Sequence, residues 1–168
     1  MPEAQHTGDG PWWRGRRGEW YVVAQVGLFA LVALGPHSWP GAPPWPPALS
    51  TGVRVVGALA IVAGAALAAT ALLRLGSRLS ALPYPKDGAD LVVTGPYRIV
   101  RNPIYSGLIL AAFGWGLWVN GLLTLIYALL LFAFFDVKSR LEERWLAEKF
   151  PGYADYQRRV RKLIPWVY

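Results

Sequence analysis

The chain contains no cysteine and only two histidines, His6 and His37, which are far apart in sequence. Without cysteine there are no disulfides, no zinc sites built on thiolates and no cysteine nucleophile. Two isolated histidines do not by themselves make a metal centre. The sequence therefore argues against a metalloenzyme, and we expect no metal ligands among the site residues.

Charged residues are also scarce. They make up 16% of the 168 residues, whereas 54% are hydrophobic and nine are tryptophan. The length fits one domain, but this composition is that of an integral membrane protein rather than a soluble globule. The net charge is +7, but the basic residues flank apolar segments and form no continuous face with exposed aromatics. We therefore expect the lipid bilayer as a partner, and no nucleic acid.

Four apolar segments predict membrane-spanning helices, at residues 20–34, 53–75, 104–119 and 122–135. Residues 1–19 are interpreted as a cytoplasmic tail, and 20–168 as a single membrane domain. A secretory signal peptide is the alternative for the first apolar segment. It is disfavoured because a segment rich in glycine and proline follows, where a small-residue cleavage site would be needed.

The connections between these segments differ in character. Residues 35–51 are rich in proline and tryptophan, which predicts a stiff loop at the membrane interface. Residues 74–101 form a connection too long and too basic for a simple linker, which suggests function. Asn120 and Gly121 are a turn signal, so the last two segments should form an antiparallel hairpin. Its second helix is expected to continue into 136–150.

The distribution of positive charge predicts the topology. Sixteen of the 17 lysines and arginines lie in the tail, in 74–101 or after Phe135, and Arg54 is the exception. Positive charge is enriched on the cytoplasmic side of membrane proteins. We therefore predict an all-α integral membrane fold of about four transmembrane helices, ending in a helical hairpin that extends into a cytoplasmic helix. Both termini and any polar site should then be cytoplasmic.

Residues 94–107 form a polar stretch that is rich in turn-forming residues, contains two arginines and leads directly into an apolar segment. Pro96 and Pro103 fix the backbone and lack donors, and Pro103 suits the first turn of a helix. Arg98 and Arg101 lie beside the free backbone N–H groups of that helix start, which favours binding of an anion at the membrane edge. Ser106 and Gly107 are small enough to allow a ligand or another helix to approach closely.

A second motif follows at 136–150 and allows two interpretations. The spacing of Asp136, Arg140 and Glu143 is that of an exposed helix with salt bridges along one face. Alternatively, Glu142 and Glu143 face the basic loop and bind a ligand that carries ammonium or hydroxyl donors. We favour the second interpretation because both motifs lie on the same side of the membrane.

The residues Gly-Pro-Tyr-Arg-x-Val-Arg-Asn-Pro-x-Tyr-x-Gly at 95–107, followed by Arg-x-Glu-Glu at 140–143, resemble the isoprenylcysteine carboxyl methyltransferase and phospholipid methyltransferase superfamily. The resemblance covers the C-terminal half of the chain. It implies a membrane enzyme that uses S-adenosylmethionine, has no Rossmann fold and methylates a lipophilic acceptor. It also implies a cofactor site lined on one side by Glu142 and Glu143, and on the other by Tyr97, Arg98, Arg101, Asn102, Tyr105 and Gly107.

One departure from the family pattern bears on the reaction. Asn102 stands where the carboxyl methyltransferase branch usually has histidine, and it is closer to the phosphatidylethanolamine N-methyltransferase branch. Asparagine does not titrate, so it cannot act as a general base. An ionised carboxylate acceptor needs no base, which slightly favours carboxyl O-methylation. N-methylation and a non-catalytic membrane scaffold stay open as alternatives.

Two further expectations concern the end of the chain. Arg140 is the candidate for holding an acceptor carboxylate, with a structural ion pair as the alternative. The basic and aromatic residues 158–168 are expected to lie on the anionic inner leaflet, with closure over the site as the less favoured alternative. The identity of the acceptor and the oligomeric state are not readable from the sequence.

Overall fold

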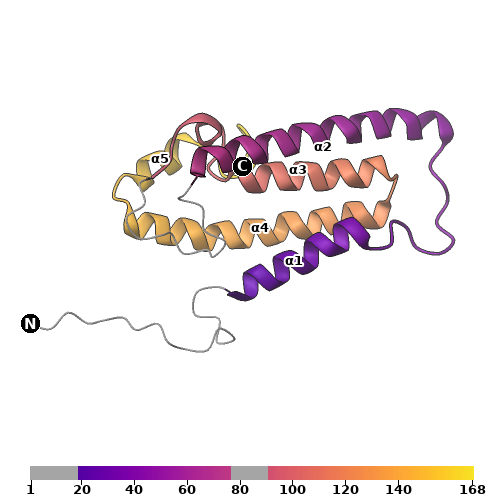
Figure 1. The fold of residues 1–168 in the computed structure, drawn as a ribbon, viewed down its shortest axis with the longest axis horizontal. Helices are drawn as coiled ribbons and strands as arrows, with labels where there is room; N and C mark the ends of the chain where they lie inside the picture. The colour runs from indigo at the N-terminus through magenta and orange to yellow at the C-terminus, as the bar shows by residue number, and fades with distance from the viewer. Residues whose placement is uncertain (1–18, 77–90) are drawn as a thin grey trace, which may run out of the picture.

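The computed structural model describes residues 19–76 and 91–168 (Figure 1). Its elements are α1 (Glu19–Leu34), α2 (Pro47–Leu75), the 3-10 helix η3 (Gly95–Arg98), α3 (Pro103–Trp118), α4 (Leu122–Lys149) and α5 (Tyr153–Arg159). Apart from one isolated parallel bridge between Val100 and Arg161, the described residues contain no β-structure. The predicted all-α class is confirmed. Most of the predicted tail and the middle of the 74–101 connection lie outside the described residues.

The four long helices lie side by side in the order α2, α3, α4, α1 (Figure 1). The loop 35–46 lies at one end of this bundle, and α5 and η3 lie at the other. The core is built mainly from α4, whose Ala128, Leu131 and Phe135 are almost fully buried. Ile109 of α3 and Val32 of α1 complete it. Helix α4 therefore joins α1 and α3 and carries the second motif.

Helix α2 begins earlier than the sequence prediction. We expected a loop up to residue 51 and a helix from 53, but the helix starts at Pro47. Pro47 occupies the first turn, where its missing N–H has no helical partner to lose. Between Pro47 and residue 53, Ser50, Thr51 and Gly52 are weak helix formers, but none of them breaks a helix. The proline-rich loop therefore ends at Pro46.

Small residues bring α2 and α3 into close contact. A Cβ atom on Gly64 would lie 2.4 Å from the carbonyl oxygen of Gly107, and one on Gly107 would lie 2.5 Å from that of Gly64. The same relationship recurs further along the two helices. A Cβ atom on Gly57 would lie 2.6 Å from the carbonyl oxygen of Gly114, and one on Gly114 would lie 2.7 Å from that of Gly57. No larger side chain fits at these positions unless the helices move apart.

The hairpin between α3 and α4 also fixes the loop 35–46. Asn120 adopts a left-handed backbone conformation with φ of 50°, in keeping with the predicted turn. The amide N–H of Leu123 donates to the carbonyl oxygen of His37 over 3.0 Å. The Nδ1 atom of His37 lies 3.0 Å from the hydroxyl oxygen of Thr124. The loop is thus attached to the start of α4.

Among the described residues, two helices are long and apolar enough to cross a membrane: α2, in which an 18-residue stretch has a mean hydropathy of 2.3, and α4, in which such a stretch has 1.8. Residues 20–34 and α3 form shorter apolar helices. Large apolar side chains on α2 face outward, and Leu59, Val62 and Leu73 are 65%, 67% and 82% exposed. Such a surface suits contact with lipid. The described residues contain an apolar helix at each of the four predicted positions, and two of these helices have the length of a full span. Membrane crossing by all four stays a prediction.

The segment after α5 differs from expectation. We predicted that 158–168 lies on the membrane surface, but Lys162 and Leu163 are buried, with only 6% and 2% exposed. The hydroxyl of Ser106 donates to the carbonyl oxygen of Leu163 over 2.6 Å. Further along, Trp166 and Val167 are highly exposed. The surface prediction is therefore wrong for Lys162 and Leu163, which belong to the core.

Candidate active site

The two sequence motifs meet at the end of the bundle that carries α5. The loop from 99 to 102 runs beside the C-terminal segment, where the amide N–H groups of Arg101 and Asn102 donate to the carbonyl oxygens of Arg161 and Lys162 at 2.7 and 3.1 Å. Pro103 then begins α3, as predicted. This backbone pairing holds the side chains of Arg101 and Asn102 against α4.

Arg101 and Glu143 form a bidentate ion pair across this junction. Nε of Arg101 donates to one carboxylate oxygen of Glu143 at 2.9 Å, and an Nη donates to the other at 3.0 Å. Two parallel N–H···O bonds fix the orientation of both groups. The remaining Nη of Arg101 donates to the carbonyl oxygens of Gln157 and Val160. Arg101 therefore joins the loop, α4 and α5.

Glu143 is fully occupied by protein donors. Asn102 Nδ2 donates to it over 2.9 Å and Gln157 Nε2 over 3.2 Å, in addition to the two bonds from Arg101. These four bonds match the four lone-pair positions of a carboxylate. Burial alone would lower the pKa of Arg101, but the hydrogen bond and charge of Glu143 outweigh it, so this pKa lies above its ordinary value. The interpretation of this helix face as solvated is wrong for Glu143, which is buried.

Glu142 belongs to a different cluster. The hydroxyl of Tyr105 donates to Glu142 Oε1 over 2.7 Å, and the ammonium of Lys138 lies 3.8 Å from the same oxygen. The ring of Tyr105 stacks on Phe135 with 4.3 Å between ring centroids. Lys138 is only 3% exposed and donates to Gln25 Oε1 of α1 over 2.7 Å. Glu142 retains lone pairs for a further donor, which Glu143 does not.

Tyr97 lies close enough to Glu142 for the charge of this carboxylate to affect the pKa of the phenol. Burial of the phenol, reinforced by the negative charge of Glu142, raises the pKa of Tyr97 to about 12. The backbone carbonyl of Tyr97 accepts a bond from the hydroxyl of Tyr156, which ties η3 to α5. Burial also raises the pKa of Tyr153 and of Tyr156 above the ordinary value. These phenols are therefore hydrogen-bond donors near neutral pH.

Three predicted site residues lie outside these clusters. Arg98 is exposed and has no ion-pair or hydrogen-bond partner among the described residues. Gly107 faces α2, where it makes the close helix contact described above. The guanidinium of Arg140 points outward and pairs with Asp136 at 2.7 Å and with the hydroxyl of Tyr168 at 3.1 Å. The predicted spacing of Asp136 and Arg140 is thus realised as an ion pair.

Several residues of the site were missed by sequence reasoning. They are Lys138 and Gln25 beside Glu142, Gln157 beside Glu143, and Lys162, whose ammonium donates to Asp136 over 2.6 Å. Lys138 and Glu142 have the spacing of a helical ion pair, so that contact carried a readable signal. Among residues 19–76 and 91–168 there is no cluster of three or more histidine, cysteine, aspartate or glutamate side chains arranged for a metal ion.

Comparison with known sequences places these motifs in a family. The sequence model for phospholipid methyltransferases matches residues 53–152. That range contains all of α3 and α4, and every residue of the two carboxylate clusters except Gln25 and Gln157. The match therefore covers more than half of the chain.

Individual relatives support the match. The chain is 30% identical over 153 residues to the cobalt-zinc-cadmium resistance protein CzcN of Cupriavidus metallidurans, covering 90% of this chain and 64% of that one. It is 32% identical over 117 residues to the protein-S-isoprenylcysteine O-methyltransferase of Saccharomyces cerevisiae, covering 67% of this chain and 49% of that one. The corresponding enzyme of Schizosaccharomyces pombe is also 32% identical, over 108 residues, 62% of this chain and 46% of that one. The chain thus spans about half to two thirds of these relatives.

Proposed function

The chain belongs to the phospholipid methyltransferase family, and from this premise we propose that it transfers a methyl group from S-adenosylmethionine to a lipophilic acceptor at the membrane interface. Its relatives include isoprenylcysteine O-methyltransferases, which supports methyl transfer as the type of reaction. The observation that carries the proposal is the pair of adjacent glutamates with different surroundings. Glu143 is saturated by protein donors, whereas Glu142, among the described residues, accepts a hydrogen bond from Tyr105 alone and lies near Lys138.

The residues present fit the chemistry of this cofactor. S-adenosylmethionine, when bound, supplies a methyl group on a positively charged sulfur atom. Glu142 has acceptor capacity for an ammonium or ribose hydroxyl group, and the phenol of Tyr97 supplies a donor beside it. Tyr105 donates its hydroxyl to Glu142 and so orients this carboxylate. Arg98 is an exposed cation suited to a cofactor carboxylate. We assign these residues to direct contact with the cofactor.

A second group of residues has a positioning role in this proposal. Arg101, Asn102 and Glu143 bind one another and hold the loop against α4, so we assign them to the wall of the cofactor site. Gly107 contributes by allowing α2 to pack against α3 at this level. The catalytic effect expected of such a site is alignment and exclusion of water, since the reactive group belongs to the cofactor.

We propose a lipophilic carboxylate as the first choice of acceptor. Such an acceptor is ionised at neutral pH and needs no base. The buried ammonium of Lys138, next to Glu142, supports binding of an anionic group, and the exposed guanidinium of Arg140 is a further cation on this helix. N-methylation of a phospholipid is the alternative, favoured by Asn102 in the position where the carboxyl methyltransferase branch usually has histidine.

The proposal includes a membrane orientation. We propose that α1 to α4 all span the bilayer, with residues 20–168 as a single domain and both termini in the cytoplasm. In the part of the chain that the structure describes, the lysines and arginines supporting this lie near the C-terminal ends of α2 and α4, in 98–101 and from α5 onward, and Arg54 lies near the start of α2 at the other end of the bundle. The cofactor site would then open on the cytoplasmic side, with the bilayer and its lipids as partners.

Calorimetry of S-adenosylmethionine binding to the detergent-purified protein tests the proposed site. Replacing Glu142 by Gln should weaken binding by about ten- to 150-fold, the value of a charge-assisted hydrogen bond of about 1.5–3 kcal/mol. Glu148 lies on the same helix and is exposed, so Glu148→Gln is the matched control and should change affinity by less than about fivefold. Equal and small effects of both substitutions would reject the assignment of Glu142.

A further inference from the structure

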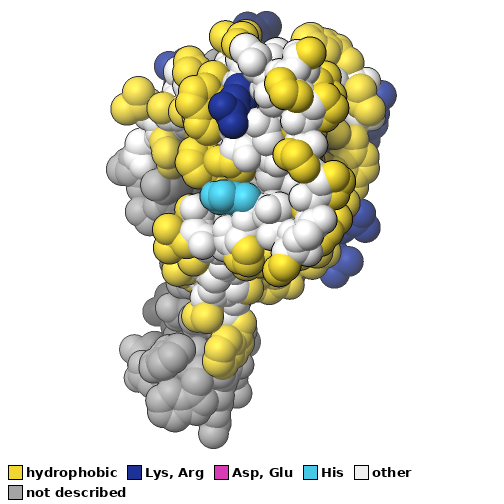
Figure 2. Space-filling model, turned by 90° about the vertical axis from the view of Figure 1, so that its right-hand side faces the viewer, with side chains coloured by type: hydrophobic (Ala, Val, Ile, Leu, Met, Phe, Trp, Pro, Cys, Tyr) yellow, Lys and Arg dark blue, Asp and Glu magenta, His cyan; other side chains and the backbone are white. Residues whose placement is uncertain are grey.

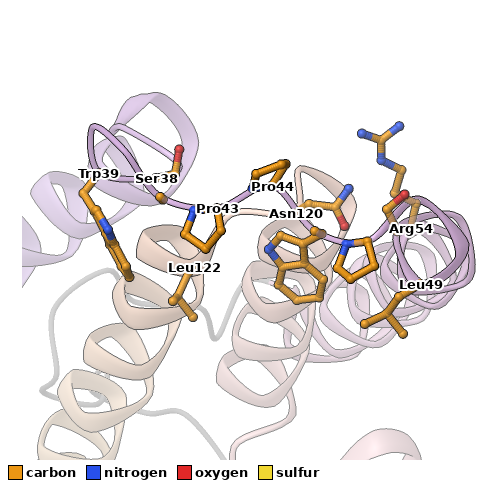
Figure 3. A pocket seen from close by; sticks show the side chains of 12 residues that line it. Ser38, Trp39, Pro43, Pro44, Leu49, Arg54, Asn120 and Leu122 are labelled. Atoms are coloured by element: carbon orange, nitrogen blue, oxygen red, sulfur yellow. The ribbon is translucent and has the colours of Figure 1, made fainter.

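A hollow of about 660 Å³ lies at the end of the bundle opposite the two glutamates (Figure 3). Three segments line it: the loop 35–46, the start of α2 and the turn between α3 and α4. Its walls are largely apolar and aromatic, with Trp39, Trp45 and Leu49 among them. Tryptophan is enriched where membrane meets water. The hollow is thus placed to meet the headgroup region of the bilayer.

The walls of this hollow are fixed rather than loose. His37 bonds to Leu123 and Thr124 at the start of α4, which holds the loop in place. A Cβ atom on Gly121 would lie 3.0 Å from both Cβ and the carbonyl oxygen of His37, so the loop and the hairpin are in tight contact. Prolines 43, 44 and 46 restrict the backbone further. The surface that this hollow offers to a ligand is therefore largely preformed.

Arg54 supplies the charge of the hollow. With the Asn120 amide turned so that its oxygen faces Arg54, this oxygen accepts from Nε at 2.8 Å and from an Nη at 3.2 Å. A guanidinium has five N–H donors, so three remain for a ligand. No acidic side chain is visible among the side chains coloured by type on this face (Figure 2). Within the described residues, Arg54 therefore has a neutral partner and no counter-ion here.

An apolar hollow of about 380 Å³ adjoins the first. It is lined by residues of α2, including Val53 and Val56, and by Leu117 of α3. Leu49 lines both hollows, so they lie on either side of one side chain. A largely apolar hollow that carries one arginine, next to an apolar groove on an exposed helix face, matches an amphiphile with one anionic group.

We propose that this end of the protein binds a glycerophospholipid, with the phosphodiester on Arg54 and an acyl chain along the groove past Leu49. Arginine binds phosphate oxygens through several N–H donors at once, and within residues 19–76 and 91–168 no carboxylate pairs with Arg54. The two tryptophans would lie at the level of the glycerol backbone. The bound lipid is distinct from the methyl acceptor, because the two glutamates lie at the opposite end of the bundle.

Native mass spectrometry of the delipidated full chain tests this site. The probes are dilauroyl phosphatidylglycerol, dilauroylglycerol, which lacks the phosphate, and inorganic phosphate. We expect one phosphatidylglycerol to bind preferentially, with affinity at least about tenfold lower in Arg54→Gln. Arg74→Gln is the matched control, because Arg74 is an exposed arginine at the other end of the same helix. It should leave this binding unchanged.

The outcomes separate the sources of the phosphate. Equal binding of dilauroylglycerol, or equal loss in both arginine variants, would overturn the assignment of Arg54 to a phosphodiester. Displacement of the lipid by millimolar inorganic phosphate would indicate a simple anion site and overturn the lipid proposal. Circular dichroism of Arg54→Gln should retain the wild-type melting curve in detergent, so that lost binding reports on the site and not on folding.

Discussion

Arg101 and Glu143 lie 42 positions apart in sequence and face each other through two parallel hydrogen bonds of 2.9 and 3.0 Å. One comes from the loop before α3 and the other from the cytoplasmic extension proposed for α4. Both side chains are about nine-tenths buried. The pair therefore holds together the two motifs that the sequence places far apart.

Glu143→Gln should destabilise the protein by about 3–5 kcal/mol, because it leaves the buried Arg101 without its counter-charge. Unfolding in urea, followed by circular dichroism in detergent micelles, measures the change. Glu148→Gln is the control, as an exposed substitution on the same helix, and should cost less than about 0.5 kcal/mol. A loss below about 1 kcal/mol for Glu143→Gln would show that the pair does not hold the loop.

Asn102→Leu should cost about 1–3 kcal/mol of stability, because Glu143 loses one of its four donors inside the protein. Asn102→His keeps a ring N–H and should recover most of this loss. Thermal unfolding of the two variants side by side measures the difference. If leucine and histidine behave alike, the hydrogen bond from Asn102 to Glu143 is not what this position contributes.

Gly107→Ala should destabilise the protein by about 1–3 kcal/mol, because the new methyl group would lie 2.5 Å from the carbonyl oxygen of Gly64. Gly27→Ala in α1 is the matched control, since a Cβ atom there meets nothing within 4 Å. Alanine favours a helix over glycine, so Gly27→Ala should be neutral or stabilising by up to about 1 kcal/mol. Opposite signs in the two melting curves are the expected result, and equal signs would contradict the packing argument.

The buried phenols predict a delayed alkaline titration. The pKa of Tyr97 is about 12 in the fold, above the ordinary value near 10, so the protonated phenol is favoured in the folded state. Its stabilising contribution is fully present below about pH 10 and is lost as the pH rises toward 12. Ultraviolet titration should show fewer than the eight tyrosines ionising near pH 10 while the helices persist. Tyr97→Phe should remove one late-titrating group, and simultaneous ionisation of all eight would contradict the burial.

The sequence predicted much of the fold, because apolar segments and turn signals act locally. Pro103 in the first turn of α3, the turn at Asn120 and the continuation of α4 past Phe135 were all readable from local preferences. The start of α2 could not be predicted in this way. The residues between Pro47 and residue 53 are weak helix formers by themselves, and they are helical because the strong helix that follows extends over them. Local rules therefore located the helices more reliably than their ends.

The site was predictable as two motifs, but the contacts within it were not. Which glutamate is saturated depends on Gln157 and Asn102 arriving from other elements, and this is a tertiary property. The link from Lys138 to Gln25 joins residues 113 positions apart. The sequence allowed two predictions for Gly107, close contact with a ligand or close contact with another helix. The structure shows the contact with a helix.

The most direct test of the account is methyl transfer itself. Purified protein is incubated with methyl-labelled S-adenosylmethionine and a membrane lipid extract, and the labelled lipid is identified by mass spectrometry. We predict a base-labile methyl ester on a lipophilic acid, and much less labelled product with Glu142→Gln when the cofactor concentration is below saturation. A product methylated on nitrogen would retain methyl transfer and replace the acceptor. Absence of any labelled lipid, with a folded protein and a saturating concentration of cofactor, would contradict the proposed methyltransferase activity.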